Sequence, residues 1–236
     1  MMKKTINYRC DQCANTFEDF YSKLSLADYA VFMEHKKVVF KRRREIIFEE
    51  GKQAQGLYCI YEGKVKIFKN GLDGREQITR IAIKGEILGI KALLSGHPYS
   101  VSATALEPTT LCIISKNDFF YLTLRYPDFT KALVTCLAQL LQDAENKMIS
   151  LAHKQVRVRL AETLILLNPN IGMEKPDPPP YLNITRNDLA NLIGTSTETL
   201  IRSLAEFKNS GMISIKGRKI FIEDASALKK IAQMTS

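Results

Sequence analysis

The sequence predicts an α+β protein with a β-rich N-terminal half, one long helix and a small, mainly helical C-terminal part. Short apolar runs that end at glycines recur between residues 45 and 114, as is typical of strands joined by tight turns. An apolar repeat with alternating spacings of three and four follows at residues 134–151 and indicates a helix. Two short helical patterns then meet at Gly194, a residue that tolerates a sharp chain reversal. Strands followed by helices favour α+β over parallel α/β layers.

Length, charge and hydropathy limit the kind of protein. The chain has 236 residues, of which 45% are hydrophobic, enough for one large or two modest domains. Its net charge of +9 favours a polyanionic partner such as nucleic acid, although this balance also occurs in proteins that bind none. No apolar run approaches the ~18 residues of a membrane span, and the first residues lack the apolar block of a signal peptide. We therefore expect a cytoplasmic protein without a membrane partner.

The N-terminal extension, residues 1–24, carries a pair of cysteines separated by two residues. Such a pair can supply two thiolates to a metal ion or an iron–sulfur cluster. The five cysteines of the chain are Cys10, Cys13, Cys59, Cys112 and Cys136. Because this number is odd and a cytoplasmic location is expected, a disulfide framework is not, and metal binding, redox chemistry or plain burial remain.

Residues 25–125 carry the pattern of a β-roll. Two basic runs, 35–37 and 41–44, lie between apolar residues, which favours a solvated strand and turn over a basic patch that meets nucleic acid. Residues 64–69 alternate between polar and apolar, as a half-buried strand should, and residues 71–74 mark a hairpin turn. Many short strands with this punctuation indicate a β-roll or jelly roll.

Residues 126–152 are expected to form a dimerisation helix. Apolar side chains recur along it as a coiled-coil seam. The seam residues are Val134, Leu137, Leu141, Ala144, Met148 and Leu151. Leu133 and Leu140 form a second stripe that can face the β-roll. The seam fits either an intrachain core or a parallel homodimer, and a helix that is apolar on two sides favours the homodimer.

The C-terminal part, residues 153–236, contains two short helices joined by a turn. Thr185 can cap the first helix, Gly194 ends it, and Thr195 or Ser196 can cap the second. Each helix has an apolar face, formed by Leu189, Leu192 and Ile193 on the first and by Leu200, Leu204 and Phe207 on the second. The opposite face of the second helix carries Glu198, Arg202, Ala205 and Asn209.

Two further strands, 212–215 and 219–222, are expected to pair around Gly217 as a wing, whose tip is basic. Two short helices with a basic hairpin beside them are typical of helix-turn-helix DNA-binding domains. Arg202 can donate two hydrogen bonds to guanine O6 and N7, while Glu198 can accept one from cytosine N4. The alternative for these two residues is an ordinary surface ion pair between positions i and i+4.

The two helices and the wing resemble the helix-turn-helix of the CRP/FNR family. This family comprises bacterial transcription regulators such as the cAMP receptor protein and the fumarate and nitrate reduction regulator. The matching residues are Thr185-Arg186, Gly194, Glu198-Thr199, Arg202, Ser210-Gly211-Met212 and Lys216-Gly217. The resemblance extends more loosely over nearly the whole chain. It implies a homodimeric regulator, not an enzyme, that binds double-stranded DNA at a palindromic site containing TGA and contacts RNA polymerase.

By this resemblance, Glu198 and Arg202 read base edges, and residues around them hold phosphates or shape the contact. The predicted DNA-binding set is Thr185, Arg186, Ser196, Thr197, Glu198, Ile201, Arg202, Lys216 and Arg218. Ile201 stands where the oxygen-sensing members have a serine that helps to read an outer base. Its apolar side chain either packs on a thymine methyl group or merely fills space, so the outer-base preference stays open.

The glycine spacing of the β-roll resembles that of the cyclic-nucleotide-binding sensor domain of the family. The candidate effector pocket consists of Gly85, Glu86, Leu88, Gly89, Ser100 and Val101. In cAMP receptors a Gly-Glu pair orients the ribose, and a later arginine holds the cyclic phosphate. Gly85 and Glu86 meet the first requirement, but residues 95–101, where the arginine is expected, contain none. A buried charge without its partner costs ~3 to 5 kcal/mol, so tight cAMP binding is not expected. The effector is therefore unknown, and a true cAMP receptor is the alternative.

The oxygen-sensing members of the family bind an iron–sulfur cluster through four cysteines. Cys10 and Cys13 match the first two, and Cys112 falls where the fourth is expected. Asp19 takes the place of the third, and a carboxylate is a harder and poorer ligand for such a cluster than a thiolate. A cluster is therefore not expected, and Cys112 is expected to be a small buried residue. An iron–sulfur or redox-sensing protein that uses Cys10, Cys13 and Cys112 remains the alternative function.

Overall fold

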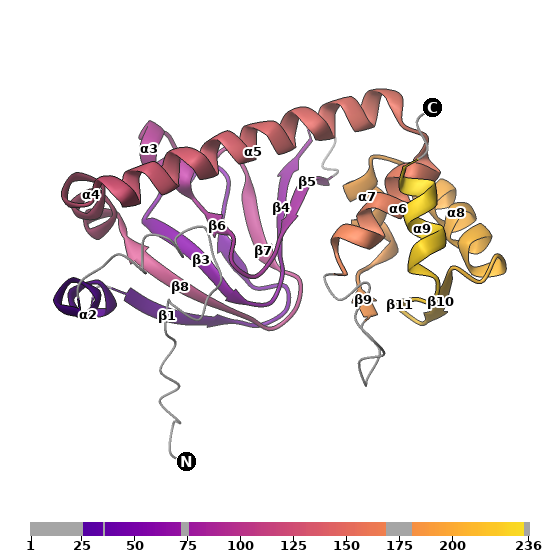
Figure 1. Cartoon of the computed structure of the whole chain (residues 1–236), viewed down its shortest axis with the longest axis horizontal. Helices are drawn as coiled ribbons and strands as arrows, with labels where there is room; N and C mark the ends of the chain where they lie inside the picture. Colours follow the sequence, from indigo (N-terminus) through magenta and orange to yellow (C-terminus); the bar gives the residue numbers. More distant parts are fainter. Residues whose placement is uncertain (1–25, 35, 72–75, 169–180, 234–236) are drawn as a thin grey trace, which may run out of the picture. The chain divides into compact units, whose positions relative to one another are not determined.

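The chain forms two compact units, which share one long helix (Figure 1). The parts that the computed structural model describes are residues 26–34, 36–71, 76–168 and 181–233. The first unit comprises Met1–Lys69 and Thr79–Leu141, and the second comprises Asn70–Ile78 and Gln142–Ser236. Helix α5 (Pro127–His153) begins in the first unit and ends in the second. The predicted cysteine pair at Cys10 and Cys13, and Asp19, lie outside the described residues.

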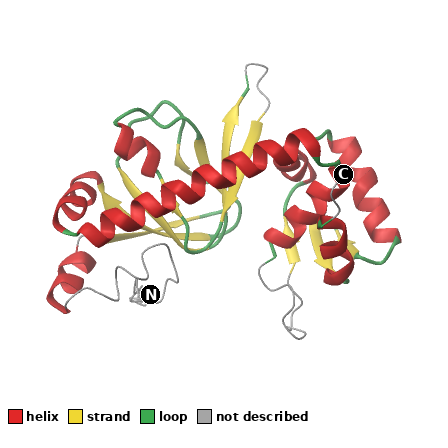
Figure 2. Ribbon diagram, turned by 45° about the horizontal axis from the view of Figure 1, so that its top comes forward, coloured by secondary structure: helices red, strands yellow, loops and turns green. Residues whose placement is uncertain are grey.

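The N-terminal half is built mainly from short strands. They are β1 (Lys36–Lys41), β2 (Ile46–Phe48), β3 (Gly56–Glu62), β4 (Val65–Asn70), β5 (Glu76–Ala82), β6 (Ile87–Leu88), β7 (Ser102–Ala105) and β8 (Thr109–Ser115). The helices before α5 in the described residues are α2 (Leu26–Glu34), α3 (Ile90–Ser95) and α4 (Lys116–Arg125). Within the described chain these strands form two four-stranded sheets, in the orders β1-β8-β3-β6 and β2-β7-β4-β5 (Figure 2). The predicted β-roll is confirmed.

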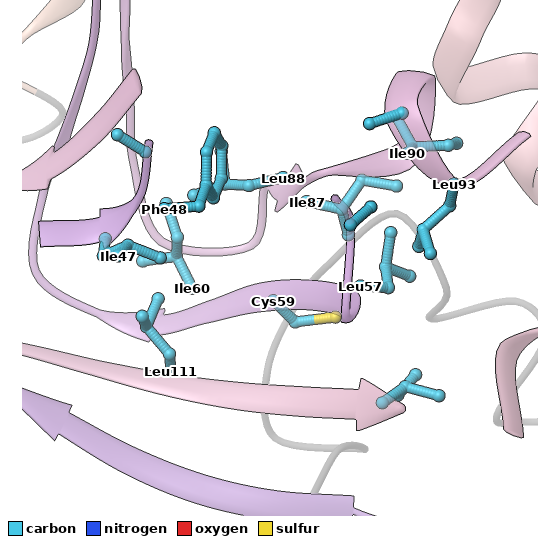
Figure 3. Packing of buried hydrophobic residues seen from close by; sticks show 14 of the residues in the cluster. Ile47, Phe48, Leu57, Cys59, Ile60, Ile87, Leu88, Ile90, Leu93 and Leu111 are labelled. Carbon is cyan, nitrogen blue, oxygen red and sulfur yellow. The ribbon is translucent and has the colours of Figure 1, made fainter. Parts of the chain in front are cut away.

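Apolar side chains from strands of both sheets meet in the core of the roll. Figure 3 shows Phe48 of β2, Ile60 of β3, Leu88 of β6, Leu93 of α3 and Leu111 of β8 in this cluster. Each of them is at least nine-tenths buried. Adjacent strands pair antiparallel, for example β1 with β8 and β3 with β8, and their backbone hydrogen bonds hold each sheet together.

The strand predicted at residues 64–69 is confirmed as β4, but Lys66 departs from the expected alternation of buried and exposed side chains. Val65, Lys66 and Ile67 are all buried, and Lys66 is only 9% exposed. Strand β4 lies between β7 and β5 in its sheet, so neither of its edges is open to solvent. Lys66 is accommodated because its aliphatic stem is covered while its ammonium lies 4.7 Å from the centre of the Phe68 ring. Strands β4 and β5 are neighbours in this sheet, but residues 72–74 of the predicted hairpin turn lie outside the described residues.

The first half of helix α5 packs on the β-roll. Phe129 and Leu133 are almost fully buried in the core of the roll, and Leu140 packs against it. The predicted inner stripe of Leu133 and Leu140 is therefore confirmed. Leu137, which the sequence assigns to the dimer seam, is half-buried and packs against the same core. It lies at the border between the inner face and the seam because it is one turn of helix beyond Leu133.

The C-terminal part is a small helical unit with one sheet. Its elements after α5 are α6 (Val156–Leu166), β9 (Tyr181–Asn183), α7 (Arg186–Ile193), α8 (Thr197–Asn209), β10 (Ile213–Lys216), β11 (Lys219–Ile222) and α9 (Ala225–Ala232). The sheet has the order β10-β11-β9, so the wing has three strands instead of the predicted two. Strand β9 is too short to give a periodic signal, but Leu182 is buried opposite Ile220, and Tyr181 packs on Phe221.

None of the helices in the described residues combines the length and the hydropathy that crossing a bilayer requires.

Candidate nucleic-acid interface

Helix α7 has well-formed caps at both ends. The Thr185 side-chain oxygen accepts the backbone N–H of Asp188 at 3.0 Å and donates to the Asp188 carboxylate at 2.6 Å. Gly194 ends the helix with a φ of 68°, and its N–H donates to the carbonyl of Ala190. Both caps were predicted from the sequence, and they determine where the turn toward α8 begins.

Helix α8 is capped by Ser196, the second of the two residues that the sequence allowed. The Ser196 hydroxyl accepts the N–H of Thr199 at 3.2 Å. The predicted apolar face is confirmed, because Leu200, Leu204 and Phe207 are at most 2% exposed. Burial of this face fixes which side of α8 faces the solvent.

The solvent-facing side of α8 carries the predicted base-reading residues. Glu198 and Arg202 are exposed, and Ile201 beside them is 52% exposed. Within the described chain, neither the Glu198 nor the Arg202 side chain makes an ion pair or a side-chain hydrogen bond. The alternative of an i, i+4 surface ion pair is therefore wrong for this structure. Both groups keep their acceptors and donors for another molecule. Thr197, the first residue of α8, is half-buried.

The wing tip presents the exposed cations Lys216, Arg218 and Lys219 and is contacted by a fourth cation, Arg186. Lys216 and Arg218 are exposed, and the Lys216 ammonium lies 5.8 Å from the centre of the Phe221 ring. Arg186, at the start of α7, is half-buried and donates to the carbonyl of Gly217 at 3.3 Å. Burial lowers the pKa of the Arg186 guanidinium. Arg186, a member of the predicted DNA-binding set, thus contacts the wing through Nη2, while its buried Nη1 has no hydrogen-bond partner among the described residues.

Two cations outside the predicted DNA-binding set, Lys147 of α5 and Arg159 of α6, contact the end of α7. Both donate to backbone carbonyls at the C-terminal end of α7. The sequence does not indicate these two contacts, because the accepting carbonyls of α7 lie more than 30 residues away from Lys147 and Arg159 along the chain.

The candidate effector residues in the roll do not form a site for a cyclic phosphate. None of the six is cationic. Glu86, expected to orient a ribose, instead forms an ion pair with Arg80 and accepts the N–H of Ile83. Leu88 is buried in the core, and Val101 packs against it. Gly85 is also buried, while Ser100 is exposed.

Aromatic side chains fill the space beside these residues. The Tyr99 ring stacks on Phe48 with 4.1 Å between ring centres, and Phe48 also contacts Tyr58. Burial and the neighbouring Tyr58 raise the pKa of the Tyr99 phenol, which stays neutral. The six candidate residues thus offer no cation for the phosphate of cAMP.

The described cysteines are core residues. Cys59 and Cys112 face each other across strands β3 and β8, and both are less than 5% exposed, which confirms the predicted burial of Cys112. Cys136 is half-buried and packs against the same core. In the described part of the chain, no three His, Cys, Asp or Glu side chains come together as a metal site.

Most of the predicted dimer seam lies open on α5. Val134, Leu141 and Met148 are each more than 60% exposed, and Ala144 is exposed as well. Leu151 is 39% exposed, because the end of its side chain lies against Gly194. A row of large apolar side chains in water is unusual for a monomer and indicates a surface that another molecule covers.

Two family profiles match the chain over most of its length. The cyclic nucleotide-binding domain matches residues 38–126, and the Crp-like helix-turn-helix domain matches residues 158–231. The fumarate and nitrate reduction regulatory protein of Escherichia coli K12 is 29% identical over 204 residues, which cover 86% of this chain and 80% of that protein. The fumarate nitrate reduction regulatory protein of Klebsiella oxytoca is 28% identical over 201 residues, 85% of this chain and 79% of that protein.

Solved structures show the same fold. FixK2 from Bradyrhizobium japonicum superposes with a TM-score of 0.73 at 22% identity and covers 85% of this chain and 99% of its own. A CRP/FNR-family transcriptional regulator from Thermus thermophilus superposes with a TM-score of 0.72 at 23% identity, covering 85% and 100%. The two profiles follow each other in the order of the β-roll and the capped helix pair described above. The chain therefore belongs to the CRP/FNR family of transcription regulators.

Proposed function

We propose that the chain binds double-stranded DNA as a homodimer and places two copies of α8 in successive major grooves of a palindromic site. The observation that carries this proposal is the exposed pair Glu198 and Arg202, which has no partner among the described residues on a helix that is otherwise capped and anchored. A carboxylate and a guanidinium one helical turn apart match the donor and acceptor pattern of neighbouring base pairs. The proposed target contains TGA, as the family resemblance implies.

Phosphate contacts would fix the register of the helix in the groove. Lys216 and Arg218 at the wing tip are exposed and cationic, and the N-terminal N–H groups of α8 near Ser196 point out of the helix end. Such contacts carry no sequence information but supply much of the affinity. Their loss should weaken binding to every duplex alike.

Dimerisation would occur through the open seam on α5. The exposed Val134, Leu141 and Met148 recur every seven residues, as one stripe of a parallel coiled coil requires. A signal received by the β-roll would change the packing of the paired helices and move the two copies of α8 into or out of the spacing of ~34 Å that successive major grooves need. RNA polymerase is the further partner that the family resemblance implies.

Arg202→Ala tests the base-reading assignment. We expect the affinity for the best site selected from random DNA to fall by ~1 to 3 kcal/mol, and the preference at one base position to relax, because the guanine contact is lost. Both changes can be measured by fluorescence anisotropy and by repeating the selection with the variant.

Lys208→Ala is the matched control, since Lys208 is also an exposed cation on α8 but lies in its last turn. It should leave the base preference of the selected site unchanged. If Arg202→Ala lost affinity equally for the selected site and for random DNA, Arg202 would hold a phosphate and the base-reading role would be wrong.

The effector is expected not to be cAMP. Calorimetric titration of the full chain with cAMP or cGMP should give no binding isotherm up to ~1 mM, because Glu86 is already paired with Arg80 and no cation among the six candidate residues awaits the phosphate. Binding in the micromolar range would contradict this expectation and make the β-roll a true cyclic-nucleotide receptor.

A further inference from the structure

The C-terminal end of helix α7 is held by cations from two other helices. An α-helix ends with backbone carbonyls that have no donor within the helix and that carry the negative end of the helix dipole. In α7, the Leu192 carbonyl accepts from the Lys147 ammonium at 2.5 Å, and the Ile193 carbonyl accepts from Arg159 Nε at 2.8 Å. These carbonyls come immediately before the turn that leads into α8.

Arg159 joins the ends of two helices. Its Nη2 donates to the Gly194 carbonyl at 3.1 Å, beyond the end of α7. Its Nη1 donates to the Lys154 carbonyl at 2.6 Å and lies 3.5 Å from the Leu151 carbonyl, at the end of α5. One planar guanidinium thus bridges the carbonyl ends of α5 and α7. Arg159 itself lies on α6, so it supports the junction from a third helix.

Lys147 is the member of this group that belongs to α5. Lys147 is half-buried. Desolvation and the nearby Arg159 charge lower the pKa of its ammonium, while the Glu162 carboxylate opposes this shift. Glu162 also forms an ion pair with Lys154. An apolar side chain of similar length would avoid the cost of desolvating an ammonium. A lysine here gains a directional hydrogen bond to α7 that an apolar residue cannot make.

Apolar packing adds a second contact between the same two helices. The Leu151 side chain lies against Gly194, where a Cβ atom would be 2.6 Å from Leu151 Cδ2. Lys147 and Leu151 are four residues apart on α5 and therefore share one face. One face of the last two turns of α5 thus meets the end of α7 through a hydrogen bond and a close apolar contact.

We propose that Lys147 is a positioning residue, which fixes the direction of the helix-turn-helix relative to the end of the dimerisation helix through the Leu192 carbonyl. In a dimer, this contact holds the two copies of α8 at one separation and one rotation. The inference rests on the proposed function, since it needs two heads on one duplex. It assigns to Lys147 no contact with DNA.

The test compares three duplexes with the full-length chain and its Lys147→Met variant. The duplexes are a palindrome selected by the wild-type chain, the same palindrome with one base pair inserted at its centre, and a duplex with one half-site. We expect the variant to bind the palindrome about tenfold more weakly and to discriminate about tenfold less against the insertion, because its heads are less firmly oriented. Its affinity for the single half-site should stay within about twofold of the wild-type value.

Two further variants serve as controls. Lys131→Met removes an exposed lysine from the same helix and should behave as the wild type on all three duplexes. Lys147→Arg keeps a cationic donor and should restore most of the discrimination. Equal losses by Lys147→Met on the half-site and on the palindrome would mean that the residue only stabilises the domain, and would overturn the proposal. Unchanged discrimination by Lys147→Met would overturn it as well. If the wild type itself bound both palindromes equally, the proposed dimeric function would fail first.

Discussion

Replacing Leu141 by Glu is expected to convert the protein to a monomer and to weaken its binding to a palindromic site by ~100-fold or more, since ionised carboxylates would be buried in the seam. Leu141 is 62% exposed on α5, between the equally open Val134 and Met148. In a parallel homodimer the two copies of this position meet across the symmetry axis, so the substitution places two like charges together. Sedimentation at micromolar concentration measures the mass, and fluorescence anisotropy measures the affinity.

Gln139→Glu provides the matched control for this experiment. Gln139 is exposed two residues before Leu141, and therefore lies about 200° around the helix from it. The same charge there should leave both the mass and the affinity unchanged. A Leu141→Glu variant that remains dimeric would show that the open seam on α5 is not the dimer interface.

The parts of the structure that the sequence predicted are those whose signals are local. The caps of α7 and α8 follow from Thr185, Gly194 and Ser196, whose side chains or backbone act within four residues. The exposed side of α8 follows from the spacing of its buried leucines, because a helix has a fixed period. The sequence alone therefore places Glu198 and Arg202, the proposed base-reading residues, on the exposed side of α8.

The parts that the sequence did not predict depend on residues far apart in the chain. The ion pair of Arg80 with Glu86 changes the interpretation of a Gly-Glu motif, yet neither residue is unusual alone. Arg186 reaches a carbonyl 31 positions away in the wing. Lys147 reaches one 45 positions away. Backbone carbonyls carry no residue identity, so no pattern of side chains could have indicated these two contacts.

Leu137 illustrates a limit of helical periodicity. The heptad pattern assigns it to the dimer seam, while the structure packs it against the core of the β-roll. On this helix the seam and the inner stripe lie only about 40° to 80° apart, so some positions border on both. Residue spacing alone cannot assign such a border position to one of the two stripes. The division comes from what α5 packs against, and the apolar core around Phe129 and Leu133 decides it for this half of the helix.

Phe207→Ala is expected to lower the free energy of unfolding of the helix-turn-helix by ~3 to 5 kcal/mol, through lost burial and the cavity that remains. Phe207 is fully buried, its carbonyl accepts the N–H of Met212 after the helix, and Arg157 lies 5.8 Å from the centre of its ring. Hydrogen exchange of the α8 amides in the full-length chain measures the change. Protection should fall by ~100-fold to 4,000-fold if these amides exchange by opening of this unit.

Phe207→Leu is the conservative control and should cost only ~1 kcal/mol, because it keeps most of the apolar volume. Equal loss of protection in the two variants would mean that the ring does not anchor α8.

Added DNA separates stability from recognition, since a ligand at 100 times its Kd stabilises the folded state by ~2.7 kcal/mol. Phe207→Ala should therefore regain much of its protection on the selected palindrome, because Glu198 and Arg202 are unchanged in it. Arg202→Ala should show the reverse behaviour, with normal protection when free and little gain from the same duplex.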